Sequence, residues 1–362
     1  KRSSKRGVSR VFIILKLFSE GPALLARILQ ISRLVCLVRM PRIVSHIRFV
    51  VLAGVLFGLL IGAGSWALLL APGPHHNARQ IIIARGQSLD NVIHELASSG
   101  VLRSALVFSV YSRFAGPVQA GEFDLPPRAN MRDISRILRL GDVVMHAITV
   151  PEGMTSQQVV ELLFSEPVLS GEASIPAEGS LLPETYFVPR GHARTALLAK
   201  MQAAQDQALK QLWENRQPGL PLQTPQEAGV LASIVEKETG QAGERGQVAA
   251  VFVNRLRKRM RLQSDPTIIY GLVGGKGTLG RPIRLSEIGK PTPYNTYTIF
   301  GLPPTPIANP GREALAAVLD PPSTSALYFV ANGTGGHIFA DTLTEHNKNV
   351  RRWRKLQKQL RQ

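Results

Sequence analysis

The sequence from Phe49 to Ala71 contains 23 residues without a charged side chain, bounded by Arg48 and by Pro72-Gly73-Pro74. A run of this length can cross the hydrocarbon core of a bilayer, where a helix satisfies its own backbone polar groups. The sequence therefore predicts a single N-terminal transmembrane helix over residues 49–71. A buried core helix and a cleavable signal peptide are the alternatives, and the length of the run favours a retained anchor.

Positive charge is concentrated at the two ends of the chain. Of the formal net charge of +18, residues 1–48 contribute +10 (11 Lys/Arg, one acid) and residues 348–362 contribute +7 (7 Lys/Arg, no acid), which leaves +1 for the middle. A nearly neutral middle needs no nucleic-acid partner. Because Lys and Arg precede the apolar run, we expect a cytoplasmic N-terminus and an exported, periplasmic remainder.

Residues 1–48 form a basic cytoplasmic segment in which Lys and Arg interrupt short apolar runs. Such a segment is expected to lie on an anionic membrane surface. Met40 stands just before the apolar run, and we expect residues 1–39 to be an upstream extension without a folded role. The single cysteine, Cys36, cannot form an intramolecular disulfide, and no histidine pair has HExxH spacing, so no metal or cofactor is expected.

Residues 79–145 are predicted to form a small mixed module. A strand at IIIARG is followed by a helix capped by Ser88, a helix near residues 105–114, a strand in QAGEFDLPP and a helix ended by Gly141. The strand–turn–helix design resembles a LysM-type carbohydrate-binding unit. Residues 146–362 are expected to form one mixed α+β domain, so the chain belongs to the α+β class.

The stretch from Thr224 to Gly240 is typical of a helix with both ends marked. Thr224 and Glu227 form a capping box, and Gly240 stands where a C-terminal cap is expected. The apolar face is made of Leu231, Ile234 and Val235. Glu238 continues this face, whereas Glu236 is rotated roughly 160° away around the helix axis.

A carboxyl group on the apolar face is expected to be partly desolvated. Desolvation raises the pKa of a carboxyl, which suits a general acid that works near neutral pH. This makes Glu238 a catalytic candidate, although a solvated glutamate in the last helical turn is the alternative. In the next helix, Arg255 lies on an apolar stripe, which favours a buried structural ion pair over a substrate clamp.

Two Pro/Gly-stiffened loops, residues 261–272 and 291–311, are rich in aromatic and polar side chains. Aromatic rings beside amides and hydroxyls are typical of carbohydrate grooves, since sugars offer apolar faces and hydroxyl groups. The alternative is solvated turns. The candidates for holding the ligand are Gln263, Ser264, Asp265, Tyr270, Tyr294, Asn295, Thr296 and Tyr297. A third loop, residues 178–191, contributes Tyr186.

Several segments in this order resemble the YceG-like family of endolytic murein transglycosylases over residues 79–355. They are LPETY (182–186), ASIVEKET (232–239), VFVNRLRKRMRLQSDPTIIYG (251–271), PYNTYTIFGLPPTPIANPG (293–311), LYFVANGTGGHIF (327–339) and EHNK (345–348). In that family the catalytic acid is the glutamate of the Glu-Thr pair, which falls on Glu238. Glu184 stands where the family commonly has Asp, and Ser180 where it has a bulky residue, so details of the groove wall differ.

The resemblance implies a lyase that cuts the MurNAc–GlcNAc bond of nascent glycan strands and leaves a 1,6-anhydro end. One glutamate serves as acid and then as base, and no metal or organic cofactor is implied. Glu184, Glu236 and Arg255 are then supporting or subsite groups. The implied partners are peptidoglycan strands, the cytoplasmic membrane and, as candidates, cell-wall synthases. The competing hypothesis is a non-catalytic peptidoglycan-binding scaffold.

Overall fold

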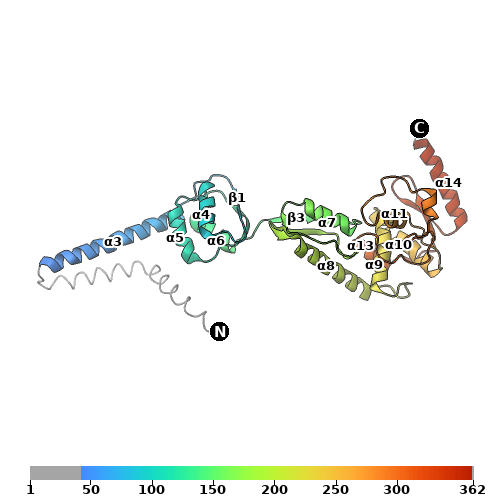
Figure 1. The fold of residues 1–362 in the computed structure, drawn as a ribbon, viewed down its shortest axis with the longest axis horizontal. Coiled ribbons are helices and arrows are strands. Elements are labelled where there is room, and N and C mark those ends of the chain that lie inside the picture. The colour runs from blue at the N-terminus through green and yellow to red at the C-terminus, as the bar shows by residue number, and fades with distance from the viewer. Residues whose placement is uncertain (1–41, 361–362) are drawn as a thin grey trace.

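A computed structural model describes residues 42–360. Figure 1 shows an elongated α+β molecule in which the elements follow one another in chain order, from helix α3 (Arg42–Leu70) at one end to α14 (Leu343–Leu360) at the other. The expected surface segment and extension within residues 1–41, with Cys36, lie outside the described residues.

Helix α3 contains the predicted apolar run. Its stretch His46–Leu70 has 25 residues, about 38 Å at 1.5 Å per residue, and faces no other part of the protein over its most apolar window. It is the one helix among residues 42–360 that is long and apolar enough to cross a bilayer. At its end Leu69 is buried against the first module, and Pro72 and Gly73 follow.

The first module contains five elements around one apolar core. They are β1 (Arg79–Ile83), α4 (Leu89–Ser98), α5 (Ala105–Ala115), β2 (Gly121–Leu125) and α6 (Met131–Leu140). Strands β1 and β2 pair antiparallel, with Ile81 opposite Phe123. The predicted cap is confirmed, because the Ser88 hydroxyl accepts a hydrogen bond from the Asn91 N–H.

A second unit has its own core between α7 and α8. It consists of β3 (Met145–Thr149), α7 (Ser156–Ser165), β4 (Leu169–Ser170), β5 (Thr185–Pro189), β6 (His192–Ala193) and α8 (Arg194–Glu214). Strands β3 and β5 pair antiparallel, so β5 replaces part of the loop expected at 178–191. Along β5 the side chains alternate, which buries Tyr186 and exposes Phe187.

The third unit is built around α9 (Pro225–Glu238). The other elements are α10 (Ala242–Arg257), α11 (Asp265–Val273), α12 (Leu285–Ile288), α13 (Arg312–Leu319), the predicted hairpin β7 (Tyr328–Ala331) and β8 (His337–Ala340), and α14. Helices α8, α10, α11 and α13 all pack against α9, and every residue from Ala228 to Val235 is buried. The predicted apolar stripe is therefore one part of a helix enclosed on all sides.

Two sequence predictions for this unit need correction. The cap of α9 is Thr239, which leaves the helix with φ −139°, so Glu238 is the last helical residue and Gly240 lies beyond it. Residues 265–273, expected to be a loop, form α11, because Pro266 suits a first turn and Gly274 closes the helix in the left-handed conformation at φ 62°.

The hydrophobic cores lie in chain order. One belongs to the first module, and residues 146–362, expected as one domain, contain two separate clusters, one centred on α7 and α8 and one on α9. The proposed boundary between residues 145 and 146 falls at the start of β3. The LysM-like character of the first module and the domain limits stay predictions.

Candidate active site

Glu238 lies where α9 ends against the loop that leads into α11. Because Thr239 turns the backbone out of the helix, the last side chain of α9 projects beyond the packed part of the helix. Glu238 is partly exposed, whereas Val235 one turn earlier is fully buried. The side chain of Glu238 is thus largely enclosed, and only part of the residue reaches solvent.

Ser264 is the direct partner of Glu238. Its hydroxyl donates a hydrogen bond of 2.5 Å to Oε1 of Glu238. Ser264 is fully buried and precedes the first residue of α11. Its own N–H donates to the hydroxyl oxygen of Thr296 across 2.9 Å, which fixes the serine from the second loop.

The surroundings hold the carboxyl of Glu238 close to its protonation midpoint at neutral pH. Burial raises the pKa of Glu238 to about 7, the nearby Asp265 charge raises the pKa further, and the Ser264 hydrogen bond and the Arg255 charge lower it. Burial is the largest of these causes. A carboxyl in this state can give up and take back a proton near neutral pH.

Asp265 and Tyr297 form a second pair beside this carboxyl. The Tyr297 hydroxyl donates to Oδ1 of Asp265 across 2.7 Å, and Asp265 is exposed. Burial and the Asp265 hydrogen bond raise the pKa of Tyr297, so the phenol stays protonated and remains a donor. The pair presents an exposed carboxylate and a partly exposed ring.

Arg255 is a structural residue, as the apolar stripe favoured, but its partners are carbonyl groups. It is 6% exposed, and its guanidinium donates to the carbonyls of Leu327 (2.7 Å) and Leu262 (2.5 Å) while it lies over the ring of Tyr328. Burial lowers the pKa of Arg255. This arginine ties α10 to the hairpin and to the Ser264 loop.

Two predicted ligand-binding residues, Asn295 and Thr296, are buried and support the loops, whereas the role predicted for the exposed Gln263 side chain stays a prediction. Asn295 is buried and its side-chain amide donates to the carbonyls of Glu287, Ile288 and Lys290. Thr296 is buried between the two loops, bonded to Ser264 and Thr267. Gln263 is exposed, holds a left-handed backbone at φ 53° and pairs through its N–H with the Thr296 carbonyl.

Tyr270 and Tyr294 form an aromatic pair on the other side of α11. Their ring centroids lie 4.9 Å apart at 58°, and the Tyr294 hydroxyl is 2.7 Å from the Thr305 hydroxyl. Gly271 permits this approach, since a Cβ there would lie 3.1 Å from the Tyr294 Cβ. The Tyr270 hydroxyl donates to Glu178 across 3.2 Å, which brings a residue of the second unit to this pair.

Glu178 was not among the predicted site residues. Its carboxylate accepts hydrogen bonds from the Ser156 N–H and the Asn309 amide as well as from Tyr270, and burial raises its pKa. Its position beside Tyr270 depends on a contact between residues 92 positions apart, which no local pattern indicates.

Glu236, expected to be a supporting or subsite group, lies in a network separate from the Glu238–Ser264 contact. Its carboxylate accepts from the Gly311 N–H (2.9 Å) and lies 3.6 Å from Arg245, which also reaches Glu152 at 3.3 Å. Burial raises the pKa of Glu236. Because Glu236 and Glu238 are two positions apart on a helix, their side chains point to different sides. Glu236 faces the loop after β3, which belongs to the second unit.

Tyr186 and Glu184 are also separate from the Glu238 carboxyl. Tyr186 is 4% exposed, and its hydroxyl donates to the Leu182 carbonyl within the second core; burial raises its pKa to about 12. The prediction that Tyr186 lines the groove is corrected by strand alternation. Glu184 is exposed immediately before β5. Between residues 42 and 360, no three His, Cys, Asp or Glu side chains cluster as a metal-ligand set.

A family model and several known proteins match most of this chain. The model of the YceG-like family matches residues 81–352. The chain belongs to this family. It is 26% identical to the endolytic murein transglycosylase of Streptococcus pneumoniae over 84% of this chain and 65% of that protein. It is 29% identical to the endolytic murein transglycosylase of Bacillus subtilis, over 74% of this chain and 82% of that one.

A crystal structure of a YceG-like protein from Listeria monocytogenes is also similar, at 27% identity and a TM-score of 0.48 over 75% of this chain and 98% of that one. The chain spans about 65% of the length of the Streptococcus YceG-like relatives that it matches. The family match covers nearly all of the first module, from residue 81 onward, and all of the elements that position Glu238.

Proposed function

We propose that the protein is a membrane-anchored endolytic lytic transglycosylase that cuts the MurNAc–GlcNAc β-1,4 bond of peptidoglycan and leaves a 1,6-anhydro-MurNAc end. The single observation that carries this proposal is the largely enclosed carboxyl of Glu238 with its pKa raised to about 7. Family membership and the names of the relatives support the same reaction.

One carboxyl group is enough for this chemistry. Protonated Glu238 gives its proton to the glycosidic oxygen as the bond to C1 of MurNAc breaks and the GlcNAc hydroxyl leaves. The C6 hydroxyl of the same MurNAc then bonds to C1, and its proton returns to the Glu238 carboxylate. No water is consumed, so the general acid is regenerated without a second carboxylate of the kind that hydrolases need.

The neighbours of Glu238 define which oxygen reacts. Ser264 donates to Oε1, which leaves Oε2 free to carry the transferable proton. The serine is fixed by Thr296, so the carboxyl is held in one orientation before substrate binds. In this proposal, Asp265 and Tyr297 contact the sugars beside Glu238, and the Tyr270–Tyr294 pair forms the wall toward the second unit.

We further propose that α3 anchors the protein in the cytoplasmic membrane with its N-terminus inside. The excess of Lys and Arg before the apolar run supports this orientation. The following units then face the peptidoglycan, where cell-wall synthases are candidate partners.

In the same proposal, the first module binds glycan as a LysM-like unit. It has the order strand, helix, helix, strand, with β1 and β2 paired antiparallel around α4 and α5. A hollow of about 260 Å³ lies between the loops that follow β1 and α5, with Gly86 and Pro117 in its lining. A second glycan contact there would keep a strand near Glu238 between cuts.

The decisive experiment is Glu238→Gln in the full chain, tested on purified glycan strands with mass spectrometry of the products. Because glutamine cannot transfer the proton, no anhydro ends should form, while the variant stays folded and membrane-bound. Anhydro ends in normal amount from the variant would contradict the assignment. Hydrolytic, reducing ends from the unmodified protein would point to a hydrolase instead.

The competing scaffold function predicts strand binding without cleavage by the unmodified protein. A passive binder gains nothing from a buried carboxyl with a raised pKa. Burial of this group opposes its ionisation and lowers the free energy of unfolding at neutral pH. The structure thus favours catalysis over passive binding.

A further inference from the structure

The two loops that hold Ser264 and Thr296 continue side by side past the catalytic carboxyl. The Gln263 N–H donates to the Thr296 carbonyl (3.1 Å). Two residues before Gln263, the guanidinium of Arg261 lies 4.8 Å from the ring centroid of Phe300, which follows Thr296 by four residues. Arg261 is three positions from Ser264, so their Cα atoms lie within about 11 Å. In the Arg261–Phe300 pair, Arg261 therefore lies on the same loop as Ser264, whose hydroxyl contacts Glu238.

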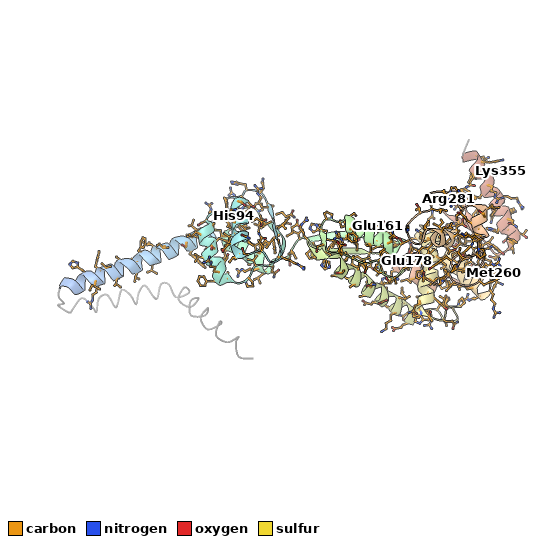
Figure 2. The ribbon with its side chains drawn as sticks, viewed as in Figure 1. His94, Glu161, Glu178, Met260, Arg281 and Lys355 are labelled. Atoms are coloured by element: carbon orange, nitrogen blue, oxygen red, sulfur yellow. The ribbon has the colours of Figure 1, made fainter. Side chains whose placement is uncertain are left out.

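Beyond this pair the surface opens into a hollow of about 460 Å³. It is lined by Leu256, Arg259, Met260, Phe300 and Gly301. Phe300 is 67% exposed, unusually high for a large ring. In Figure 2 Met260 lies at the far end of the molecule from α3, so the hollow is remote from the anchoring helix.

The rim of the hollow is cationic and has no acidic partner. Arg259 and Arg261 are exposed, and within residues 42–360 neither forms an ion pair with a carboxylate. The exposed Lys258 adds to the same charge. A ring and unpaired guanidinium groups around an apolar floor favour a ligand that carries carboxylates on a partly apolar chain.

The backbone of Arg259 gives an independent indication. Arg259 closes the end of α10 with φ 53°, a left-handed conformation that glycine adopts without strain and that a side chain opposes. Its N–H donates to the Leu256 carbonyl, and the next N–H, of Met260, donates to the Arg255 carbonyl. Arginine at this position is unfavourable for the fold alone, which indicates a role for its side chain.

Resting on the proposed function, we propose that Arg259, Arg261 and Phe300 bind the carboxylate-bearing peptide that each muramic acid of the strand carries. We call this hollow the stem-peptide site. Its nearness to Glu238 through the Ser264 loop puts a peptide there when the sugars of the same strand lie against Asp265 and Tyr297. The enzyme then prefers strands with peptides over bare strands.

Binding by the full chain carrying Glu238→Gln tests this without turnover. The probes are glycan strands with intact peptides, strands stripped of peptides by an amidase, and strands whose peptide carboxylates have been amidated. We expect intact strands to bind about 10-fold more tightly than the other two, the difference typical of a charge-assisted contact. Adding Arg259→Ala and Arg261→Ala should bring the ratio close to one.

Two variants control for loss of structure. Arg259→Gly relaxes the left-handed backbone, so it should keep the fold and still lose the preference. Arg257→Ala removes an exposed arginine of the same helix end that contacts Asn254 and the Gly219 carbonyl outside the hollow, and should keep the preference. Loss of preference in Arg257→Ala but not in Arg259→Gly would overturn the assignment.

Equal binding of all three strands by the Glu238→Gln chain would overturn the stem-peptide site and leave the proposed function intact. The proposed function is checked separately, by anhydro ends from the unmodified chain on any of these strands. Tight binding of amidated as well as intact strands would show that the peptide packs on Phe300 without recognition by charge, and would also contradict the proposal.

Discussion

The Ser264 hydroxyl donates to Oε1 of Glu238 across 2.5 Å and so joins the start of α11 to the end of α9. This contact counteracts the effect of burial on the pKa of Glu238, because a hydrogen bond to a carboxylate lowers its pKa while desolvation raises it. The pKa of about 7 is a balance between these two effects and the charges of Asp265 and Arg255. Each neighbour can therefore be tested by the direction in which it moves the pH dependence.

Ser264→Ala should shift the pH profile upward. The first chemical step needs protonated Glu238, so kcat/KM falls as pH rises through about 7. Without the hydroxyl donor the pKa of Glu238 rises and this fall moves to higher pH. Loss of orientation should lower kcat by about 10-fold, equivalent to about 1.4 kcal/mol. Ser165→Ala, whose hydroxyl contacts only its own helix end, should change neither. An unchanged profile in Ser264→Ala would exclude the contact from catalysis.

Asp265→Asn should shift the same profile in the opposite direction. The Asp265 charge raises the pKa of Glu238, and its removal makes the carboxyl easier to ionise. The fall in kcat/KM should then begin at lower pH, with a change of no more than about 5-fold at pH 6, since Asp265 is exposed. Tyr297→Phe keeps the charge and removes only the hydrogen bond, so it should not reproduce the downward shift.

Glu238 should make the fold less stable at high pH. Its pKa is about 7 in the folded chain against an ordinary 4.5, so the folded state keeps its proton where the unfolded state has lost it. The contribution of Glu238 to the free energy of unfolding is then largest below pH 4.5. It decreases by about 3 kcal/mol as pH rises through 7. Glu238→Gln should remove this decrease. Denaturant midpoints of the two proteins at pH 5 and pH 8 measure it, and parallel curves would contradict the raised pKa.

Arg245→Ala should destabilise the protein without altering its pH profile. The Arg245 side chain is 11% exposed and lies beside the carboxylates of Glu236 and Glu152, so its loss leaves the buried Glu236 without its ion-pair partner. We expect a loss of about 3 kcal/mol in the free energy of unfolding. Arg136→Ala, which breaks an exposed pair with Asp133, should lose less than about 1 kcal/mol. A large rise in KM for Arg245→Ala would instead indicate that Glu236 belongs to the substrate site.

Leu60→Arg should weaken membrane retention. Leu60 lies midway along α3, is 70% exposed and would face lipid in the proposed anchor. A charge near the bilayer centre costs about 2.5–3.5 kcal/mol on insertion scales, whereas Leu60→Ala costs far less. Flotation of the two variants in a sucrose gradient measures retention. Equal flotation of Leu60→Arg and the unmodified chain would argue against a transmembrane α3.

Local patterns were enough to predict many elements. Ser88 and Thr224 cap the helices that their sequence positions indicated, because a cap depends on residues three positions away. The same kind of local pattern, the helical repeat, placed Glu238 on the apolar face of its helix. The predicted capping box of Thr224 and Glu227 is not formed, because the Glu227 carboxylate accepts from the Gln223 N–H instead.

The sequence by itself determined the apolar run, most of the strands and helices, and Glu238 as the candidate acid, since all three follow from local periodicity and from family-like segments. Only the tertiary structure decided that Ser264 holds that acid, that Glu236 and Tyr186 are buried elsewhere, and that Glu178 meets Tyr270. The reason is that α9 is enclosed by several segments distant in sequence, so the neighbour of each of its side chains depends on packing that no local pattern specifies.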